Sequence, residues 1–524
     1  MLIDDQSKTV QALSRPEAYG LKGKKVEVRE SNISTVFLAG DKAYKLKRGV
    51  KYPYVDYSTL EKRRDACEKE LLICRGTAPG LCVGVETVVL DKGGKIKIGS
   101  QATDKNAEII DYLLVMNRFD EADLFENLAE AGRLDRFEMM DLAEKMVELH
   151  KNAEVFKHRG GATMIRGRIL ENDELMRCFV PEIFDPDDID ALKADALEAL
   201  EKYAPLLDER KAEGKVRWCH GDVHFHNIVM LNGKPALFDP VEFNDELTHI
   251  DILYDLAFLL MDMEIRGLRR LSSILFNHYM AYSADWEGVP ALPLFLSCRA
   301  AVNAYVYAQR SSETKDKELS ERLAKQAYEY LVTARRFLNP PPPVLVACGG
   351  LSGSGKSRIG RELAPFIGSP PGAVILRDDV LRKNMLGVDP DDSLGEEAYT
   401  PENEAKVFEL LCTECRRVLA TGQSVVADAL FHDENQRKAI EALAEQAGVE
   451  FRGFWVDAPL EIRKERVASR KRNPSDVKTA AVLEKQLDID VGNITWDKVD
   501  TSGDRLATLA YVRSLLAEKK QGNK

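Results

Sequence analysis

A run of histidine, aspartate and asparagine residues near the middle of the chain has the spacing of a phosphoryl-transfer site. The run is HGDVHFHN, residues 220–227, and it fits the pattern H-x-D-x-x-x-x-N. In that pattern the aspartate orients and deprotonates an acceptor hydroxyl, and the asparagine holds Mg²⁺. Asp239 follows in the apolar, strand-like stretch ALFDPVEF, and Mg²⁺ prefers hard oxygen ligands of this kind. These residues, in this order, predict metal-assisted phosphoryl transfer.

A second phosphate-binding pattern lies in the last third of the chain. GLSGSGKS, residues 350–357, is a complete G-x-x-x-x-G-K-S that follows the strand-like VLVACGG and precedes a helical run. Glycines let the backbone N–H groups curl around a phosphate, and the helix N-terminus adds a favourable dipole. We expect Lys356 to reach the β- and γ-phosphates of ATP and Ser357 to bind Mg²⁺. The residues expected to contact the nucleotide are Gly350, Ser352, Gly353, Ser354, Gly355, Lys356 and Ser357.

Residues after the second pattern favour a kinase over a mechanical ATPase. The strand-like AVIL ends in RDDVLR, residues 377–382, which resembles the D-x-x-R of zeta-toxin-like and polynucleotide-kinase-like P-loop kinases. The resemblance implies that Asp379 receives the proton of the acceptor hydroxyl and that Arg382 grips the acceptor. Asp378 fits the spacing less well. Asp428 ends the strand-like SVVAD at a Walker-B-like position, so it is a candidate magnesium ligand.

A stripe of arginines follows in PLEIRKERVASR. Arg463, Arg466 and Arg470 recur at helical spacing and therefore face one way. We expect Arg466 and Arg470 to close over ATP as a lid that neutralises charge in the transition state. The alternative is a basic helix that only faces solvent.

The first pattern also carries a family resemblance. HGDVHFHN followed by LFDPVEF resembles the aminoglycoside phosphotransferase family of small-molecule kinases, over about residues 25–335. The resemblance implies that Asp222 is the catalytic base and that Asn227 and Asp239 are magnesium ligands. Lys45, in AYKLKR, takes the place of the phosphate-binding lysine, with Lys47 on the same strand face as the alternative.

Other ATP contacts follow from the same resemblance. Glu68, in the helical CEKELLIC, is the first choice as partner of the phosphate-binding lysine, and Glu70 is the second. Ser34 lies where the phosphate loop of the family lies, although no glycine-rich G-x-G-x-x-G occurs there. Met116 begins the segment expected to meet the adenine.

Several single residues allow a second interpretation. His220, His224 and His226 form a triplet that could suggest zinc, but the kinase loop accounts for them better. Cys412 and Cys415 form a C-x-x-C inside an apolar helical run, which indicates a helix face. Asp255 lies in the apolar DILYDLAFLL, where it either braces the catalytic loop or is an exposed helical charge; the sequence leaves both open.

The domain organisation follows from a proline run. Pro340–Pro343 cannot continue a helix, so we place a boundary at about residue 339, between domains 1–338 and 339–524. Before it, strand-like segments precede helical ones, which indicates an α+β, two-lobed, protein-kinase-like domain. After it, strands and helices alternate, which indicates an α/β P-loop NTPase domain with a parallel sheet.

Composition narrows the function classes. The formal net charge of −12 and the absence of interleaved aromatic and basic residues argue against nucleic-acid binding. The polar N-terminus does not resemble a signal peptide. The most apolar stretch, Ile250 to Met263, is broken by Asp251, Asp255 and Asp262, so no membrane span is predicted. Nine scattered cysteines suggest no disulfide framework. A reducing cytoplasm fits this pattern best.

The sequence therefore predicts a bifunctional ATP-dependent phosphotransferase. Its cofactors are ATP and Mg²⁺, and its acceptors are hydroxyl groups of small molecules such as a sugar, an amino sugar or a related metabolite. Two alternatives remain open. One half could catalyse while the other binds ATP as a regulatory module, or the P-loop half could act on nucleic-acid ends. Neither pattern names the acceptor, because fold does not carry specificity.

Overall fold

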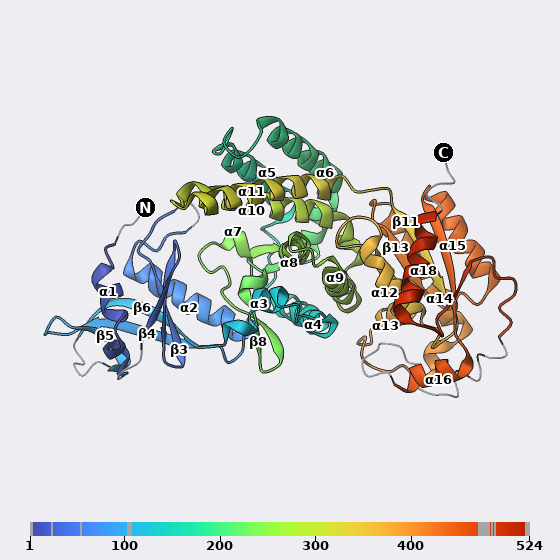
Figure 1. Ribbon diagram of the computed structural model, residues 1–524, viewed down its shortest axis with the longest axis horizontal. Coiled ribbons are helices and arrows are strands. Elements are labelled where there is room, and N and C mark those ends of the chain that lie inside the picture. Colours follow the sequence, from blue (N-terminus) through green and yellow to red (C-terminus); the bar gives the residue numbers. More distant parts are fainter. Residues whose placement is uncertain are drawn as a thin grey trace. The chain divides into compact units, whose positions relative to one another are not determined.

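In this computed structural model, the structure describes residues 4–21, 25–52, 55–101, 107–469 and 489–518, together with Leu483 and Gln486. The chain forms two compact units, shown with their helices and strands in Figure 1. One unit comprises residues 1–161 and 208–259, and the other comprises residues 162–207 and 260–524.

The first unit contains a six-stranded antiparallel sheet in the order β1-β2-β3-β6-β4-β5. Its strands are β1 (Glu27–Glu30), β2 (Ser34–Ala39), β3 (Lys42–Lys47), β4 (Cys82–Leu90), β5 (Ile96–Ile98) and β6 (Glu108–Asn117). Helix α2 (Leu60–Thr77) packs against β4 and β6. Its buried face carries Ala66, Cys67, Glu70 and Cys74 at helical spacing. A polar Glu70 on that face requires polar partners there.

The rest of the first unit is mainly helical and holds the catalytic loop. Its helices are α3 (Phe125–Glu130), α4 (Arg136–Asn152) and the start of α8 (Ile252–Ile265). It also contains two short antiparallel strand pairs, β7 (Val216–Trp218) with β10 (His249–Asp251) and β8 (Ile228–Leu231) with β9 (Lys234–Leu237). The catalytic loop includes the 3₁₀ turn Phe225–Asn227. A sheet-rich part followed by a helical part confirms the predicted kinase-like fold class.

The second unit begins with a helical layer. Its helices are α5 (Gly161–Arg177), α6 (Pro186–Ala212), α9 (Arg269–Ser283), α10 (Leu292–Glu313) and α11 (Lys317–Leu338), and α10 packs along α11. One stretch of the described residues, Trp286–Glu313, is long and apolar enough to cross a membrane, and 72% of its most apolar window is buried inside the structure. Such burial is ordinary for the core helix of a folded domain.

The second unit also contains a five-stranded parallel sheet, in the order β12-β13-β11-β14-β15, as predicted for the P-loop domain. The strands are β11 (Val344–Gly349), β12 (Val374–Arg377), β13 (Val425–Asp428), β14 (Glu450–Asp457) and β15 (Asp497–Asp500). The helices are α12 (Lys356–Leu363), α13 (Asp378–Leu386), α14 (Pro401–Leu419), α15 (Glu434–Gln446), α16 (Leu460–Ala468) and α18 (Arg505–Glu518). Strand β11, at the centre, leads directly into the phosphate loop.

The cysteines differ in one respect from the expectation. Cys74 and Cys82 form a disulfide with their Cα atoms 6.1 Å apart, so the prediction of no disulfide is wrong at this pair. The end of α2 and the start of β4 converge there, and a spacing of eight residues in the sequence does not reveal that convergence. Cys412 and Cys415 are both buried on α14, as the helix-face interpretation predicts.

Helix α11 ends at Leu338 and strand β11 begins at Val344, so the proline run separates two regular elements. The two compact units do not divide at this point, because α9, α10 and α11 group with the P-loop sheet. The boundary between domains 1–338 and 339–524 stays a prediction.

Candidate active sites

The catalytic loop of the first unit brings Asp222 and Asn227 together. Nδ2 of Asn227 donates hydrogen bonds to the Asp222 carboxylate Oδ2 and to its carbonyl oxygen, both at 3.0 Å. The backbone N–H of Phe238 donates to the Asn227 carbonyl at 2.9 Å, which ties the loop to the residue before Asp239. The side chain of Asp222 is 36% exposed, so an acceptor can reach it.

The loop can turn only because of Gly221. Its φ is 85°, and a Cβ atom there would lie 2.8 Å from the Leu247 carbonyl oxygen. Its N–H donates to Oδ1 of Asp255 at 2.9 Å, while Oδ2 of Asp255 lies 3.2 Å from Nε2 of His150. Because Asp255 is 1% exposed, the exposed-charge interpretation is wrong, and this carboxylate braces the loop.

The three histidines of the loop have separate partners. Nε2 of His220 donates to the Phe238 carbonyl at 3.0 Å, and its Nδ1 accepts from the Asp222 N–H at 3.3 Å. Burial lowers the pKa of His220, although Asp255 and Asp222 act in the opposite direction. His224 contacts the Asp222 carboxylate at 3.3 Å, and His226 pairs with Glu126. Both ring nitrogens of His220 are used, so the triplet does not converge on a metal.

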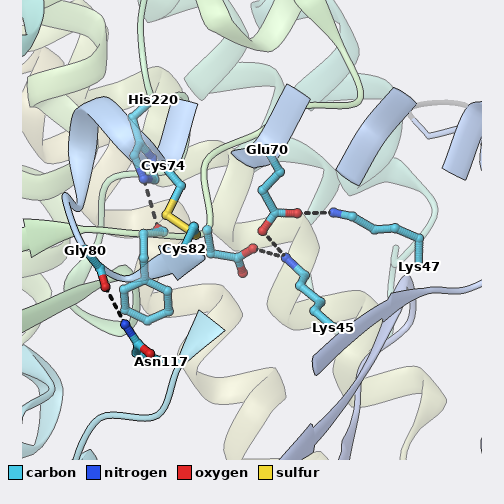
Figure 2. The surroundings of a disulfide bond; sticks show 10 residues. Lys45, Lys47, Glu70, Cys74, Gly80, Cys82, Asn117 and His220 are labelled. Carbon is cyan, nitrogen blue, oxygen red and sulfur yellow. Dashed lines mark hydrogen bonds and ion pairs between the residues drawn. A yellow bond between two sulfur atoms is a disulfide. The ribbon is translucent and has the colours of Figure 1, made fainter. Parts of the chain in front are cut away.

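Two lysines of strand β3 share one carboxylate of helix α2, as Figure 2 shows. Nζ of Lys45 lies 2.8 Å from Oε1 of Glu70 and also contacts Asp239. Nζ of Lys47 contacts the other oxygen of Glu70 and also contacts Glu242. Residues two apart on a strand point the same way, so the carboxylate meets both.

The prediction of Glu68 as the lysine's partner is wrong. Its side chain is 63% exposed and lies 4.0 Å from Arg64 on its own helix. Residue 70 falls on the buried face of α2, whereas residue 68 falls about 160° away around the helix. The second choice, Glu70, is therefore the partner.

The two lysines are not equivalent. Lys45 contacts Asp239, a candidate metal ligand, whereas Lys47 is 1% exposed and faces Glu242, which also accepts a hydrogen bond from Tyr57. Burial acts to lower the pKa of Lys45, but Asp239 and Glu70 outweigh it and raise that pKa above the ordinary value. Burial acts to raise the pKa of Asp239, and Lys45 outweighs it and holds that pKa below the usual range. Both lysines stay charged, so it is the contact with Asp239 that favours Lys45 as the phosphate ligand.

Ser34 and Met116 both lie in strands of the six-stranded sheet. Ser34 begins β2, is 8% exposed and lies opposite Lys47 in the β2–β3 pairing. Met116 lies in β6 between Ala43 and Cys82 of the neighbouring strands. Their contacts with ATP stay predictions.

The phosphate loop of the second unit needs its glycines. A Cβ atom on Gly350 would lie 2.2 Å from the Val456 carbonyl oxygen, and one on Gly353 would lie 2.8 Å from the Arg463 carbonyl oxygen. Gly350, Gly353 and Gly355 all have positive φ, of 145°, 82° and 101°. Helix α12 begins at Lys356, so its N-terminus faces the loop.

Buried polar atoms beside this loop suit a phosphate and a cation. Oγ of Ser354 is fully buried and has no hydrogen-bond partner among the described residues. The carboxylate of Asp428, at the end of β13, likewise accepts no hydrogen bond in the described part of the chain, although Nε of Arg377 lies 3.5 Å away. Unsatisfied buried acceptors are costly, so these two residues fit a bound magnesium–nucleotide complex.

Two adjacent carboxylates stand at the end of β12. Asp379 accepts from Nη2 of Arg377 at 2.7 Å and from the Val380 N–H at 2.9 Å. Burial, followed by the charge of Asp379, raises the pKa of Asp378 to about 6, against the opposing charge of Lys356. The sequence favoured Asp379, whereas the charge of the P-loop lysine acts on Asp378. The structure thus adds Asp378 as a candidate base.

Arg382 lies four residues after Asp378, on the same side of helix α13. It is 6% exposed, donates to the Ala398 carbonyl at 3.2 Å, and has its guanidinium 4.7 Å from the centre of the Tyr399 ring. Tyr399 ends the 3₁₀ turn Glu396–Tyr399, a segment in which the sequence shows no motif.

The arginine stripe braces the phosphate loop. Nε of Arg463 donates to the Ser352 carbonyl at 2.8 Å, and Nη1 of Arg466 donates to the Ser354 carbonyl at 3.1 Å. The solvated-helix alternative is therefore wrong for these two residues, while the contact of Arg466 with ATP stays a prediction. Arg470 lies outside the described residues. Gln486, which the sequence missed, accepts from the Ser352 N–H at 3.0 Å.

Two family models match separate segments of the chain. The model of the phosphotransferase enzyme family matches residues 106–292, and an AAA-domain model matches residues 345–488. The chain thus joins an aminoglycoside-phosphotransferase-like kinase domain to a P-loop kinase domain. It is an ATP-dependent kinase.

Relatives of this kinase match it over nearly the full length of both chains. Uncharacterized proteins of Mycobacterium tuberculosis and Mycobacterium bovis are 28% identical to it over 490 residues, which cover 92% of this chain and 93% of theirs. Both the kinase-like part and the P-loop part therefore lie within the matched length.

Solved structures resemble single parts of the chain. A choline/ethanolamine kinase family protein from Mesorhizobium loti is 13% identical, with a TM-score of 0.38, and the match covers 64% of this chain and 97% of that one. The aminoglycoside phosphotransferase APH(2'')-Ib is 16% identical, with a TM-score of 0.36 and coverages of 64% and 99%. A sugar kinase from Janibacter sp. is 18% identical, with a TM-score of 0.25 and coverages of 34% and 95%. At these TM-scores the likenesses carry no functional argument.

Proposed function

We propose that this kinase is bifunctional, and that each half transfers the γ-phosphoryl group of ATP to a hydroxyl group of a small molecule. The observation that supports the proposal is that each half contains a candidate carboxylate base together with candidate metal ligands. In the first half, Asn227 and Asp222 are hydrogen-bonded, and Lys45 contacts Asp239. In the second half, Asp378 and Asp379 directly follow β12, whose last residue, Arg377, pairs in register with Asp428.

In the first half, the residues would act as follows. Asn227 and Asp239 offer oxygen ligands to Mg²⁺, which when bound neutralises phosphate charge. Lys45, held by Glu70, binds the phosphates. Asp222 accepts the proton of the acceptor hydroxyl as the new P–O bond forms, while the bond between the γ-phosphorus and the β–γ bridging oxygen breaks and ADP leaves. Asp255 holds Gly221, and through it keeps Asp222 in place.

In the second half, the glycines of residues 350–357 give the backbone room to approach the phosphates. Ser357 and Asp428 are the candidate magnesium ligands, and Lys356 is the phosphate ligand. Asp378 or Asp379 receives the acceptor proton, and Arg382, stacked on Tyr399, grips an anionic or hydroxylated acceptor.

Small hydroxylated acceptors fit both halves better than nucleic acid. The net charge of −12 does not suit a phosphate backbone. We further propose that the kinase works in the cytoplasm, where ATP is available. The disulfide between Cys74 and Cys82 would there be open to reduction.

An acceptor screen tests the proposal. ATP consumption is measured against sugars, amino sugars, nucleosides and RNA ends with the wild type, Asp222→Asn, Lys356→Ala and the double variant. Acceptors lost only in Asp222→Asn belong to the first half, and those lost only in Lys356→Ala belong to the second. If the double variant keeps full turnover, both assignments fail. If one single variant abolishes all turnover, the other half is a regulatory ATP-binding module.

A further inference from the structure

A cavity of about 380 Å³ lies in the first unit, next to the residues that precede the catalytic loop. Its walls come from α2, α4, the end of β7 and the first turn of α8. Residues that matter here are Thr77, His150, Trp218, Cys219 and Asp255. No step of the proposed phosphoryl transfer takes place in this cavity.

Three of these residues offer ligand atoms at one point. One ring nitrogen of His150, Sγ of Cys219 and one carboxylate oxygen of Asp255 all lie within 4.8 Å of one another. Nε2 of His150 and Oδ2 of Asp255 are 3.2 Å apart. A tetrahedral zinc ion holds nitrogen and oxygen ligands roughly 3.3 Å apart and sulfur roughly 3.6 Å from either, by its usual bond lengths. The observed spacing needs only a small inward movement of Cys219.

The cavity offers room and partners for a fourth ligand. Oγ1 of Thr77, which is 6% exposed, and Nε1 of Trp218 line the same cavity. Neither atom has a hydrogen-bond partner among the described residues. Both can bond to water in this cavity, and a water molecule is the usual fourth ligand of a zinc ion held by three side chains. This donor set of imidazole, thiolate and carboxylate is one that zinc accepts and that magnesium and calcium do not favour.

We propose that His150, Cys219 and Asp255 bind a zinc ion, with a water molecule from the cavity as fourth ligand. Binding replaces the thiol proton of Cys219, which passes to solvent, by the metal. Cys219 lies two residues before Gly221, and Asp255 already bonds to Gly221 through its other oxygen. The ion therefore fastens the start of the catalytic loop to helices α4 and α8. It is a structural site, separate from the magnesium ligands of phosphoryl transfer.

Cobalt serves as the spectroscopic probe of this site. The full chain, freed of metal with a chelator and kept without nucleotide, is titrated with Co²⁺ and then with Zn²⁺. Thiolate coordination gives a sulfur-to-cobalt charge-transfer band, which the sulfur-free magnesium sites cannot produce. We expect the band to grow to one equivalent per chain, to disappear when Zn²⁺ displaces Co²⁺, and to be absent in Cys219→Ser.

Two further variants make the test specific. Cys412→Ser/Cys415→Ser removes the C-x-x-C of α14, the competing thiol pair, and is expected to keep the band. His150→Gln is expected to lose the tight binding seen in the wild type, and it serves in place of Cys219→Ser if that variant fails to fold by circular dichroism. Zinc is also expected to raise the unfolding temperature of the wild type but not of His150→Gln. The proposal is overturned if no band forms in the wild type, or if the band survives in Cys219→Ser, whether or not the α14 variant keeps it.

Discussion

Asn277 of helix α9 closes the open edge of strand β12 with its side-chain amide. Oδ1 of Asn277 accepts from the Ile375 N–H at 2.7 Å, and Nδ2 donates to the Ala373 carbonyl at 3.2 Å. An edge strand otherwise presents unpaired backbone groups. Since β12 leads directly into Asp378 and Asp379, a helix from before the proline run supports the candidate base of the P-loop half.

This relationship predicts that Asn277→Ala destabilises the second unit. Loss of both bonds leaves partly buried backbone groups without partners, which costs about 1–3 kcal/mol. Thermal unfolding followed by circular dichroism measures the change. Gln309→Ala, which removes an exposed amide of α10 bonded to Glu313, is the matched control and is expected to have no effect. The fragment 339–524, which lacks α9, is expected to bind ATP but to unfold at a lower temperature than the full chain. An Asn277→Ala variant that unfolds at the wild-type temperature would contradict the first expectation, and a fragment as stable as the full chain would contradict the second.

Asp222→Asn is expected to lower transfer by the first half by about 10² or more, because the residue both orients and deprotonates the acceptor. ATP binding should change little, since Lys45 and Asp239 remain. The assay uses the Lys356→Ala background, so that the second half contributes no turnover. Unchanged acceptor phosphorylation in this background would remove Asp222 from the mechanism.

Lys45 and Lys47 form a matched pair of tests. Lys45→Met is expected to weaken ATP binding and transfer while the protein stays folded, because Glu70 keeps Lys47 as a partner. Lys47→Met removes the cation beside the buried carboxylate of Glu242, which then keeps only the hydroxyl of Tyr57 as a partner among the described residues. We expect this change to lower the free energy of unfolding by about 3–5 kcal/mol. Nucleotide titration and thermal unfolding separate the two effects. The opposite pattern, a nucleotide defect confined to Lys47→Met, would exchange the two assignments.

The disulfide between Cys74 and Cys82 connects two elements of the predicted ATP site. Cys74 lies one turn after Glu70 on α2, and Cys82 pairs in register with Met116. Closing this short loop is expected to stabilise the first unit by about 2.5 kcal/mol on the chain-entropy model. Reductant, or Cys74→Ala/Cys82→Ala, should therefore lower its unfolding temperature and weaken ATP binding by the first half. Cys178→Ser, at an exposed free thiol, is the control. Identical unfolding with and without reductant would contradict the expectation.

The sequence predicted those parts of the sites that depend on local spacing. HGDVHFHN and GLSGSGKS are short segments whose residues act together because the backbone itself brings them together, and the alternation of strands and helices predicted the parallel sheet. The prediction of a residue's partner failed where the partner depends on which side of a helix faces the core. The sequence ranked Glu68 before Glu70 in CEKELLIC, but the packing of α2 turns Glu70 toward β3. Tyr399 and Gln486 reach the P-loop half from segments without a motif, and their contacts are set by tertiary packing.

The pH dependence of the P-loop half distinguishes Asp378 from Asp379. Burial and the neighbouring carboxylate raise the pKa of Asp378 to about 6, well above its ordinary value. A general base must be ionised to accept a proton. If Asp378 is the base, kcat/KM of this half rises from pH 5 to pH 7 with a midpoint near 6, and Asp378→Asn abolishes that rise and lowers transfer by about 10² or more. The stability of the fold depends on pH in the opposite direction. Because the pKa of Asp378 is higher in the folded than in the unfolded state, the neutral carboxyl group is favoured in the folded state. The stability that this group contributes is therefore lost as the pH rises through 6.

Asp379→Asn is the matched variant, since it has the same chemistry one residue along the helix. It removes the partner of Arg377 but leaves Lys356 and Arg382 in place. With Asp378 as base, Asp379→Asn should shift the midpoint downward, because a like charge next to Asp378 is gone, and transfer should fall less than in Asp378→Asn. Radiolabel transfer in the Asp222→Asn background, from pH 5 to pH 8, measures both. A full loss in Asp379→Asn with a normal profile in Asp378→Asn would return the base to Asp379, where the spacing D-x-x-R first placed it.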